Sequence, residues 1–269
     1  MIIEVLFGEI CNLYGDPQNA VYLSQTMPEA ELIHTSLDSV PFFVENRPDI
    51  ILIGSMSDNM HASVVEKLKP YKQRLIELIN DNVVFLVTGS ACEVFCNTIE
   101  NVTLETKIAG LGIVPLDAKI NWFDRYNGKV LGSCNGMTLT GFKSQFSMLY
   151  GQNNDNYFVN VDRGIGINRE SKLEGYKDHN FFVTQILGPI LPLNPEFCEY
   201  LISLTGEKAT AAFKEEATRN ADGGLYLRAF DRPLRRQQER QAGDEVELDY
   251  FDFTRARVRR ADVLPQRGR

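Results

Sequence analysis

Residues 82–95 read NVVFLVTGSACEVF: an apolar run, a turn around Gly89, and the start of a helix. An apolar run without alternation is typical of a parallel strand that is covered on both faces of its sheet. A strand, a sharp turn and a helix in this order also form the nucleophile elbow of many hydrolases, although an ordinary strand-to-helix turn gives the same pattern. The segment therefore predicts a parallel α/β sheet and draws attention to Gly89.

Similar runs precede this segment and indicate further strands at residues 1–7, 31–35 and 50–54. Helical spacing predicts a helix that begins near Gln18 and one covering helix over residues 62–80. Ligands of such sheets collect at the carboxyl ends of the strands. The loops at 9–19 (EICNLYGDPQN), 53–59 (IGSMSDN) and 87–95 are therefore the candidate ligand loops.

The pattern changes beyond Ile99 to shorter runs separated by glycines. Runs at 110–114, 127–133, 137–142, 157–161 and 164–168 predict antiparallel strands added to one side of the sheet. A last strand begins at Phe181, and a helix over residues 195–204 is expected to carry Cys198 inward. The predicted fold class is α/β, a doubly wound and mostly parallel sheet with added antiparallel strands.

Composition excludes several classes of protein. The 269 residues are 43% hydrophobic and 24% charged, which is ordinary for a globular protein. The chain lacks an apolar run of about 20 residues and a signal peptide, so we expect a cytoplasmic protein without a membrane partner. Five cysteines at irregular spacing, without a CxxC pair, suggest neither a disulfide framework nor a zinc site, and we expect most of them to be reduced, packed thiols. The net charge of −8 argues against sequence-independent binding of nucleic acid.

Charge divides the chain into a body and a tail. Residues 1–218 hold 11 Lys and 5 Arg against 27 acids, whereas residues 219–269 hold 12 Arg, no Lys and 9 acids. We therefore predict one domain over 1–205, a helical connection over 206–218, and an Arg-rich appendage over 219–269. The appendage is either a binding arm for a partner or RNA, or a segment foreign to the domain.

Several motifs together resemble those of one enzyme family. They are NLYGD at 12–16, IGSMSD at 53–58, GLGI at 110–113, Arg125 to Gly128, Gly141-Phe142, and TQILGPILP at 184–192. In this order they resemble class I (triad-type) glutamine amidotransferases of the cobyric acid synthase kind, and among them the glutaminase subunits of lipid II isoglutaminyl synthases. The resemblance covers about residues 1–205 and implies a flavodoxin-like fold, glutamine as the substrate, and a Mur-ligase-like partner subunit. It implies no metal or other cofactor.

The chain departs from the family at the catalytic residues. The family hydrolyses glutamine with a cysteine on the elbow and a histidine in a TYLHGP segment, but this chain has Gly89 and Leu187 there. The turn can survive, because glycine adopts a positive φ without steric cost. Cys92, paired with His179, is the possible stand-in for the nucleophile. Cys92 is otherwise an inert core thiol, or with Cys96 a metal ligand that lacks further ligands.

The resemblance also implies a set of binding residues. Arg125 matches the family's arginine for the α-carboxylate of glutamine; alternatively it pairs with Asp124 or Asp117 on the surface. The expected substrate-binding residues are Arg125, Gly54, Ser55 and Ser90. Asn12, Tyr14 and Asp16 match a loop that faces the partner subunit, with helix capping as the alternative role of Asp16.

Three functions remain in view from the sequence. The first is an amidotransferase-like subunit that has lost catalysis and acts as a binding or scaffolding partner of a Mur-ligase-like protein. The second is an active glutaminase that supplies ammonia for amidation of a peptidoglycan precursor or of cobyrinate. The third is a nucleic-acid-binding protein that acts through the Arg-rich tail.

Overall fold

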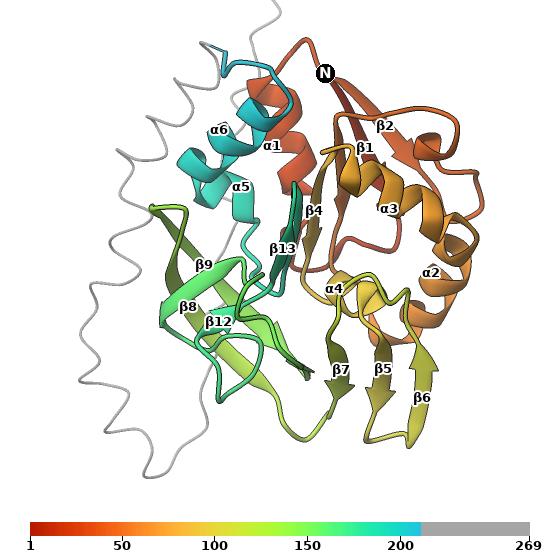
Figure 1. The fold of residues 1–269 in the computed structure, drawn as a ribbon, viewed down its shortest axis with the longest axis vertical. Helices are drawn as coiled ribbons and strands as arrows, with labels where there is room; N and C mark the ends of the chain where they lie inside the picture. The colour runs from red at the N-terminus through yellow and green to blue at the C-terminus, as the bar shows by residue number, and fades with distance from the viewer. Residues whose placement is uncertain (211–269) are drawn as a thin grey trace, which may run out of the picture. The chain divides into compact units, whose positions relative to one another are not determined.

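A computed structural model describes residues 1–210 of the chain. The predicted helical connection over 206–218 lies largely outside this range, and the Arg-rich appendage over 219–269 lies wholly outside it. Strands and helices alternate through the first part of the described chain, as a parallel α/β sheet requires (Figure 1).

The central sheet has six strands in the order β13-β14-β4-β3-β1-β2, all parallel except β13. Its strands are β1 Ile2–Leu6, β2 Glu31–Thr35, β3 Ile50–Ile53, β4 Val84–Thr88, β13 Tyr176–Asp178 and β14 Phe181–Thr184. Every residue of β3, β4 and β14 is buried, as expected for strands covered on both faces. The parallel part has the strand order of flavodoxin-like folds, and the predicted fold class is confirmed.

Helices cover both faces of this sheet (Figure 1). One face packs against α1 Gln18–Thr26, α5 Ile190–Leu193 and α6 Pro195–Leu204, and the other against α2 His61–Leu68, α3 Lys72–Asn80 and α4 Ala91–Phe95. Successive residues of β3 alternate between the two cores: Ile50 and Leu52 join the first, Ile51 and Ile53 the second. Helix α6 has its predicted bounds and buries Cys198.

The single helix expected over residues 62–80 is wrong. The chain forms α2 and α3, separated by a 3-10 turn at Lys69–Tyr71. The reason is Pro70, which has no backbone N–H to donate to a helical hydrogen bond.

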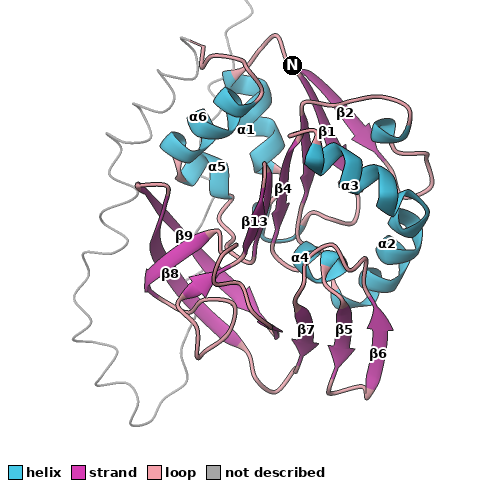
Figure 2. Cartoon of the chain, viewed as in Figure 1, coloured by secondary structure: helices cyan, strands magenta, loops and turns pink. Residues whose placement is uncertain are grey.

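The antiparallel strands do not extend the central sheet, which corrects a second expectation. They form two separate four-stranded sheets, in the orders β10-β7-β5-β6 and β12-β11-β8-β9 (Figure 2). The strands are β5 Thr98–Asn101, β6 Thr106–Ala109, β7 Asp117–Ile120, β8 Tyr126–Cys134, β9 Met137–Gln145, β10 Ser147–Tyr150, β11 Val159–Arg163 and β12 Leu173–Glu174.

Two predicted strands are loops. Residues 110–114 wrap the end of α4 instead, where the N–H groups of Leu111, Gly112 and Ile113 bond to carbonyls of Val94, Cys96 and Phe95. These carbonyls would otherwise lack partners at the helix end. Residues 164–168 form an irregular turn against β12. Within the described part of the chain, no helix is long and apolar enough to cross a membrane.

Candidate functional site

The turn between β4 and α4 has the geometry of an elbow. Gly89 adopts a φ of 59°, and α4 begins two residues later. The Gly89 N–H donates to the Thr184 carbonyl at 2.9 Å, which ties the turn to the end of β14. The backbone conformation that the sequence predicts for Gly89 is therefore present.

Two neighbouring side chains fill the space above this turn. A Cβ atom added to Gly89 would lie 2.6 Å from both Cβ and Oγ of Ser55 and 2.8 Å from Cδ2 of Leu187. Leu187 is buried, and its backbone bonds to Phe142 in both directions. The elbow thus has no room for a side chain of its own unless Ser55 or Leu187 moves.

The N–H groups near the turn are also occupied from within. The Ser90 N–H donates to Ser55 Oγ at 3.3 Å, and the Ser55 N–H donates to Asp16 Oδ2 at 2.7 Å. Ser90 Oγ in turn accepts from the Met56 N–H and donates to the Met56 carbonyl. An oxyanion hole needs free N–H donors aimed at the charge that develops on the substrate oxygen. Here the Ser55 hydroxyl accepts from the Ser90 N–H, so this donor is not free.

Gly54 brings the loop after β3 against the loop after β1. A Cβ atom at Gly54 would lie 2.8 Å from the Cys11 carbonyl oxygen and 2.9 Å from Cβ of Asp16. The predicted binding residues Gly54, Ser55 and Ser90 therefore do lie together, but their contacts hold two loops to one another.

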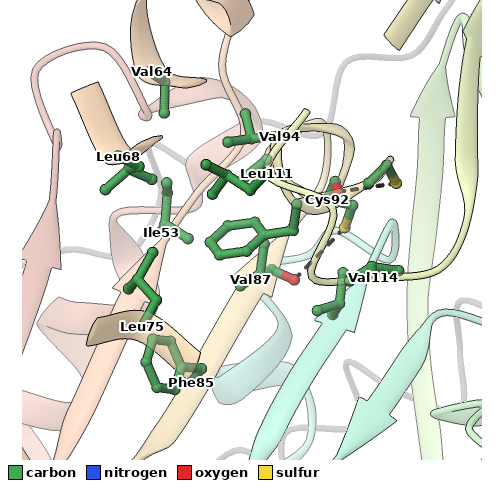
Figure 3. Close-up of a cluster of buried hydrophobic side chains, with 14 of the residues drawn as sticks. Ile53, Val64, Leu68, Leu75, Phe85, Val87, Cys92, Val94, Leu111 and Val114 are labelled. Atoms are coloured by element: carbon green, nitrogen blue, oxygen red, sulfur yellow. Dashed lines mark hydrogen bonds between the residues drawn. The ribbon is translucent and has the colours of Figure 1, made fainter. Parts of the chain in front are cut away.

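Cys92 does not reach the elbow opening. Its sulfur is fully buried, 3.8 Å from the Val87 carbonyl oxygen and surrounded by apolar side chains (Figure 3). Burial raises the pKa of this thiol well above its ordinary value, which disfavours the nucleophilic thiolate. All five cysteines are buried and free. Among the described residues, no cluster of three or more His, Cys, Asp or Glu is suited to a metal ion.

His179 lies at the opposite end of the sheet from the elbow. It precedes β14, which runs parallel to β4 in the register Thr184 to Thr88. The five residues from His179 to Thr184 span about 16 Å of extended chain. The imidazole is exposed and contacts Asp178 at 3.0 Å. The structure does not bring His179 and Cys92 together.

Arg125 lies in the exposed loop between β7 and β8. Its Nη2 donates to Ser144 Oγ at 3.2 Å, and its guanidinium lies over the Phe146 ring. Asp124, the expected surface partner, bonds to Arg169 at 2.6 Å instead. Within residues 1–210, Arg125 has no carboxylate partner, and its side-chain interactions are with Ser144 and Phe146.

The loop after β1 divides into an exposed and a buried part. Asn12 and Tyr14 are exposed, and the Tyr14 ring meets Phe142 edge-on. Asp16 is only 4% exposed, so its carboxylate is not part of the surface that a partner would touch. Its Oδ2 binds the ends of β3 and β4 through the Ser55 N–H and the Thr88 hydroxyl.

Two buried pairs of titratable side chains, Lys143 with Glu174 and His61 with Glu93, lie near the elbow and have no counterpart among the residues predicted from the sequence. Lys143 and Glu174 are both fully buried, 3.3 Å apart, and Glu174 also accepts from the Thr184 hydroxyl and the Gln185 N–H. His61 lies 3.5 Å from Glu93, whose other oxygen accepts from Ser147. Desolvation raises the pKa of Glu93 and lowers that of Lys143. Each pair joins segments far apart in sequence, so no local pattern signals it.

Comparison with known proteins places this geometry in context. No family model matches the chain. Over 235 residues it is 27% identical to the lipid II isoglutaminyl synthase (glutamine-hydrolyzing) subunit GatD of Staphylococcus aureus (strain N315), across 85% of this chain and 94% of that protein. This distant similarity over most of the chain, together with the fold and the elbow, supports a GatD-like glutamine amidotransferase family for the protein.

Proposed function

We propose that the chain is a glutamine amidotransferase-like subunit that no longer hydrolyses glutamine and serves as a binding or scaffolding partner of a Mur-ligase-like protein. One observation carries the loss of hydrolysis. The position above Gly89, where a nucleophile would project, is filled by Ser55 and Leu187. The IGSMSD loop supports the same view, because Ser55 replaces a glycine of the family's IGGGSD-like loop and its hydroxyl occupies the Ser90 N–H.

Ammonia release tests this proposal directly. The full chain, alone and mixed with a Mur-ligase-like protein from the same organism, is incubated with glutamine, and ammonia and glutamate are measured. A Cys92→Ala variant is the matched control, because Cys92 is the one elbow-helix thiol that could replace the nucleophile. We expect equal background from both proteins. Ammonia release that exceeds the control would overturn the proposal.

The alternative of an active glutaminase makes its own prediction. A thiol-directed glutamine analogue would label Cys92 selectively if this thiol had taken over the reaction, and mass spectrometry would locate the adduct. The burial of Cys92 and its raised pKa support the absence of labelling. Absence of any labelled cysteine removes the alternative.

Exposed apolar side chains support the scaffolding role. Tyr14 is 42% exposed on the loop after β1, and Phe123 is 90% exposed on the loop between β7 and β8. Exposed aromatic side chains of this size are typical anchors of protein interfaces. We expect Tyr14→Asp or Phe123→Asp to weaken binding to the Mur-ligase-like protein in titration calorimetry. Val40→Asp, an exposed apolar control on another loop, should leave the affinity unchanged. Equal affinity of all variants would contradict the scaffolding surface.

A further inference from the structure

Strand β2 ends the central sheet, and its outer side has no partner strand among residues 1–210. The Glu31 N–H and the Thr35 carbonyl group bond toward β1. Backbone groups of successive strand residues point to opposite sides, so those of Leu32 and His34 point away from the sheet. Within the described chain, no turn or side chain bonds to them. A row of free donors and acceptors of this kind can pair with one more strand.

A hollow of about 380 Å³ adjoins this free edge. Its lining includes Ile33 and His34 of β2, together with Val40, Phe42 and Glu45 of the loop that follows. Val40 is 62% exposed, so apolar surface in the hollow is open to a ligand. An added strand presents every second side chain to one face of the sheet, and an apolar side chain on that face can enter the hollow. The elbow turn does not line it.

The surroundings of β2 are acidic. Residues 1–46 contain neither lysine nor arginine, and the lining of the hollow contains neither as well. Glu31 and Glu45 are exposed and have no cationic partner in the described part of the chain, where the nearby Arg47 pairs with Asp49 at 3.7 Å. Charge complementarity therefore favours a basic strand at this edge. Two copies of this chain would bring two acidic edges together, which disfavours pairing of β2 with itself.

We propose that the free edge of β2 binds an extended, basic segment of a partner protein, which adds a strand to the six of the central sheet. The backbone of this segment exchanges hydrogen bonds with Leu32 and His34. An apolar side chain enters the hollow beside Ile33, and lysine or arginine side chains pair with Glu31 and Glu45. In strand addition the backbone bonds supply affinity and the side-chain pockets supply specificity. Binding at this edge is independent of glutamine hydrolysis at the elbow.

Titration of the full chain with short peptides tests the backbone and charge requirements. The probe is the capped peptide Lys-Val-Lys-Val-Lys-Val. Glu-Val-Glu-Val-Glu-Val reverses its charge, and a form with every backbone nitrogen methylated keeps the charge but cannot donate to β2. We expect saturable binding of the probe, at least about tenfold tighter than that of either counterpart. Failure of the probe to bind, or equal binding of the methylated form, would overturn the proposal.

Amide spectra of the nitrogen-labelled full chain locate the peptide without any variant. The Leu32 and His34 amide signals should shift during the titration, and their hydrogens should exchange more slowly in the complex, because both N–H groups gain an acceptor. The Gly89 and Ser90 signals should stay in place. Unmoved signals of Leu32 and His34 would place the peptide elsewhere and refute the site.

A proline at position 34 removes the outward N–H alone. Proline is tolerated where the N–H of an edge strand faces solvent, and the bonds toward β1 come from the neighbouring residues. We expect His34→Pro to weaken binding of the probe at least about tenfold, while the matched control His34→Ala, which keeps the N–H, binds within about threefold of the original chain. Equal binding by both variants would exclude strand addition.

A pair of double variants separates local charge from net charge. Glu31→Gln with Glu45→Gln should weaken binding of the probe about tenfold at low salt and reduce its salt dependence. Glu66→Gln with Glu170→Gln removes the same charge from exposed positions on α2 and on the turn before β12, and it should bind as the original chain does. An equal loss in the two double variants would contradict a specific acidic edge.

Discussion

Gly89→Ala measures whether the space above the elbow is filled. An alanine at a φ of 59° costs about 1 to 2 kcal/mol, because its Cβ crowds the neighbouring carbonyl oxygen. The same Cβ would lie 2.6 Å from Ser55 and 2.8 Å from Leu187, and overpacking of this kind costs about 1 to 3 kcal/mol more. We therefore expect the free energy of unfolding to fall by about 2 to 5 kcal/mol.

A second glycine isolates the backbone part of this loss. Gly136 has a φ of 80°, and a Cβ atom there meets nothing within 4 Å. Gly136→Ala should therefore lose only the backbone contribution of about 1 to 2 kcal/mol. Urea unfolding followed by circular dichroism gives both free energies, provided that the urea dependence stays the same.

A double variant tests whether Ser55 is the obstacle. Once Ser55→Gly removes the crowding hydroxymethyl group, Gly89→Ala should cost at least about 1 kcal/mol less than in the original chain, since contacting sites are not additive. If Gly89→Ala and Gly136→Ala lose equal stability in the original background, the space above Gly89 is open. Ser55 and Leu187 would then not fill the space above the elbow.

Three further outcomes follow from buried groups. Burial raises the pKa of Asp16 from 3.8 to about 6, so the folded state binds this proton more tightly than the unfolded chain does. The free energy of unfolding should therefore fall by about 3 kcal/mol as the pH rises from about 4 to 6. Asp16→Asn should remove this fall, which melting curves recorded at each pH would show. Lys143→Met should lower the free energy of unfolding by about 3 to 5 kcal/mol, because it leaves the buried Glu174 charge without its partner. The double variant Lys143→Met with Glu174→Gln should regain much of this loss. If the two losses are independent, Lys143 and Glu174 do not stabilise one another. Ellman's reagent should leave all five cysteines unmodified until urea unfolds the chain, and rapid native modification would contradict their burial.

The sequence alone determined the elements that depend on local pattern. Uninterrupted apolar runs identified β3 and β4, because only a strand covered on both faces lacks alternation. Helix α6 was predicted with its observed bounds. Glycine at the elbow predicted a positive φ that no other residue adopts as easily. Pro70 was a local signal too, and giving it more weight would have predicted the break between α2 and α3.

Only the tertiary structure decided what occupies the candidate site. Ser55 and Leu187 come from loops 34 residues before and 98 residues after Gly89, yet both fill the space above it. The burial of Asp16, which the motif suggested as part of a partner surface, depends on the close approach of Gly54. Strand and helix periods report which face a residue occupies on its own element. These periods carry no information about which residue of another element packs against that residue. Such contacts between elements decide whether a pocket stays open, is filled by side chains, or encloses a charged group.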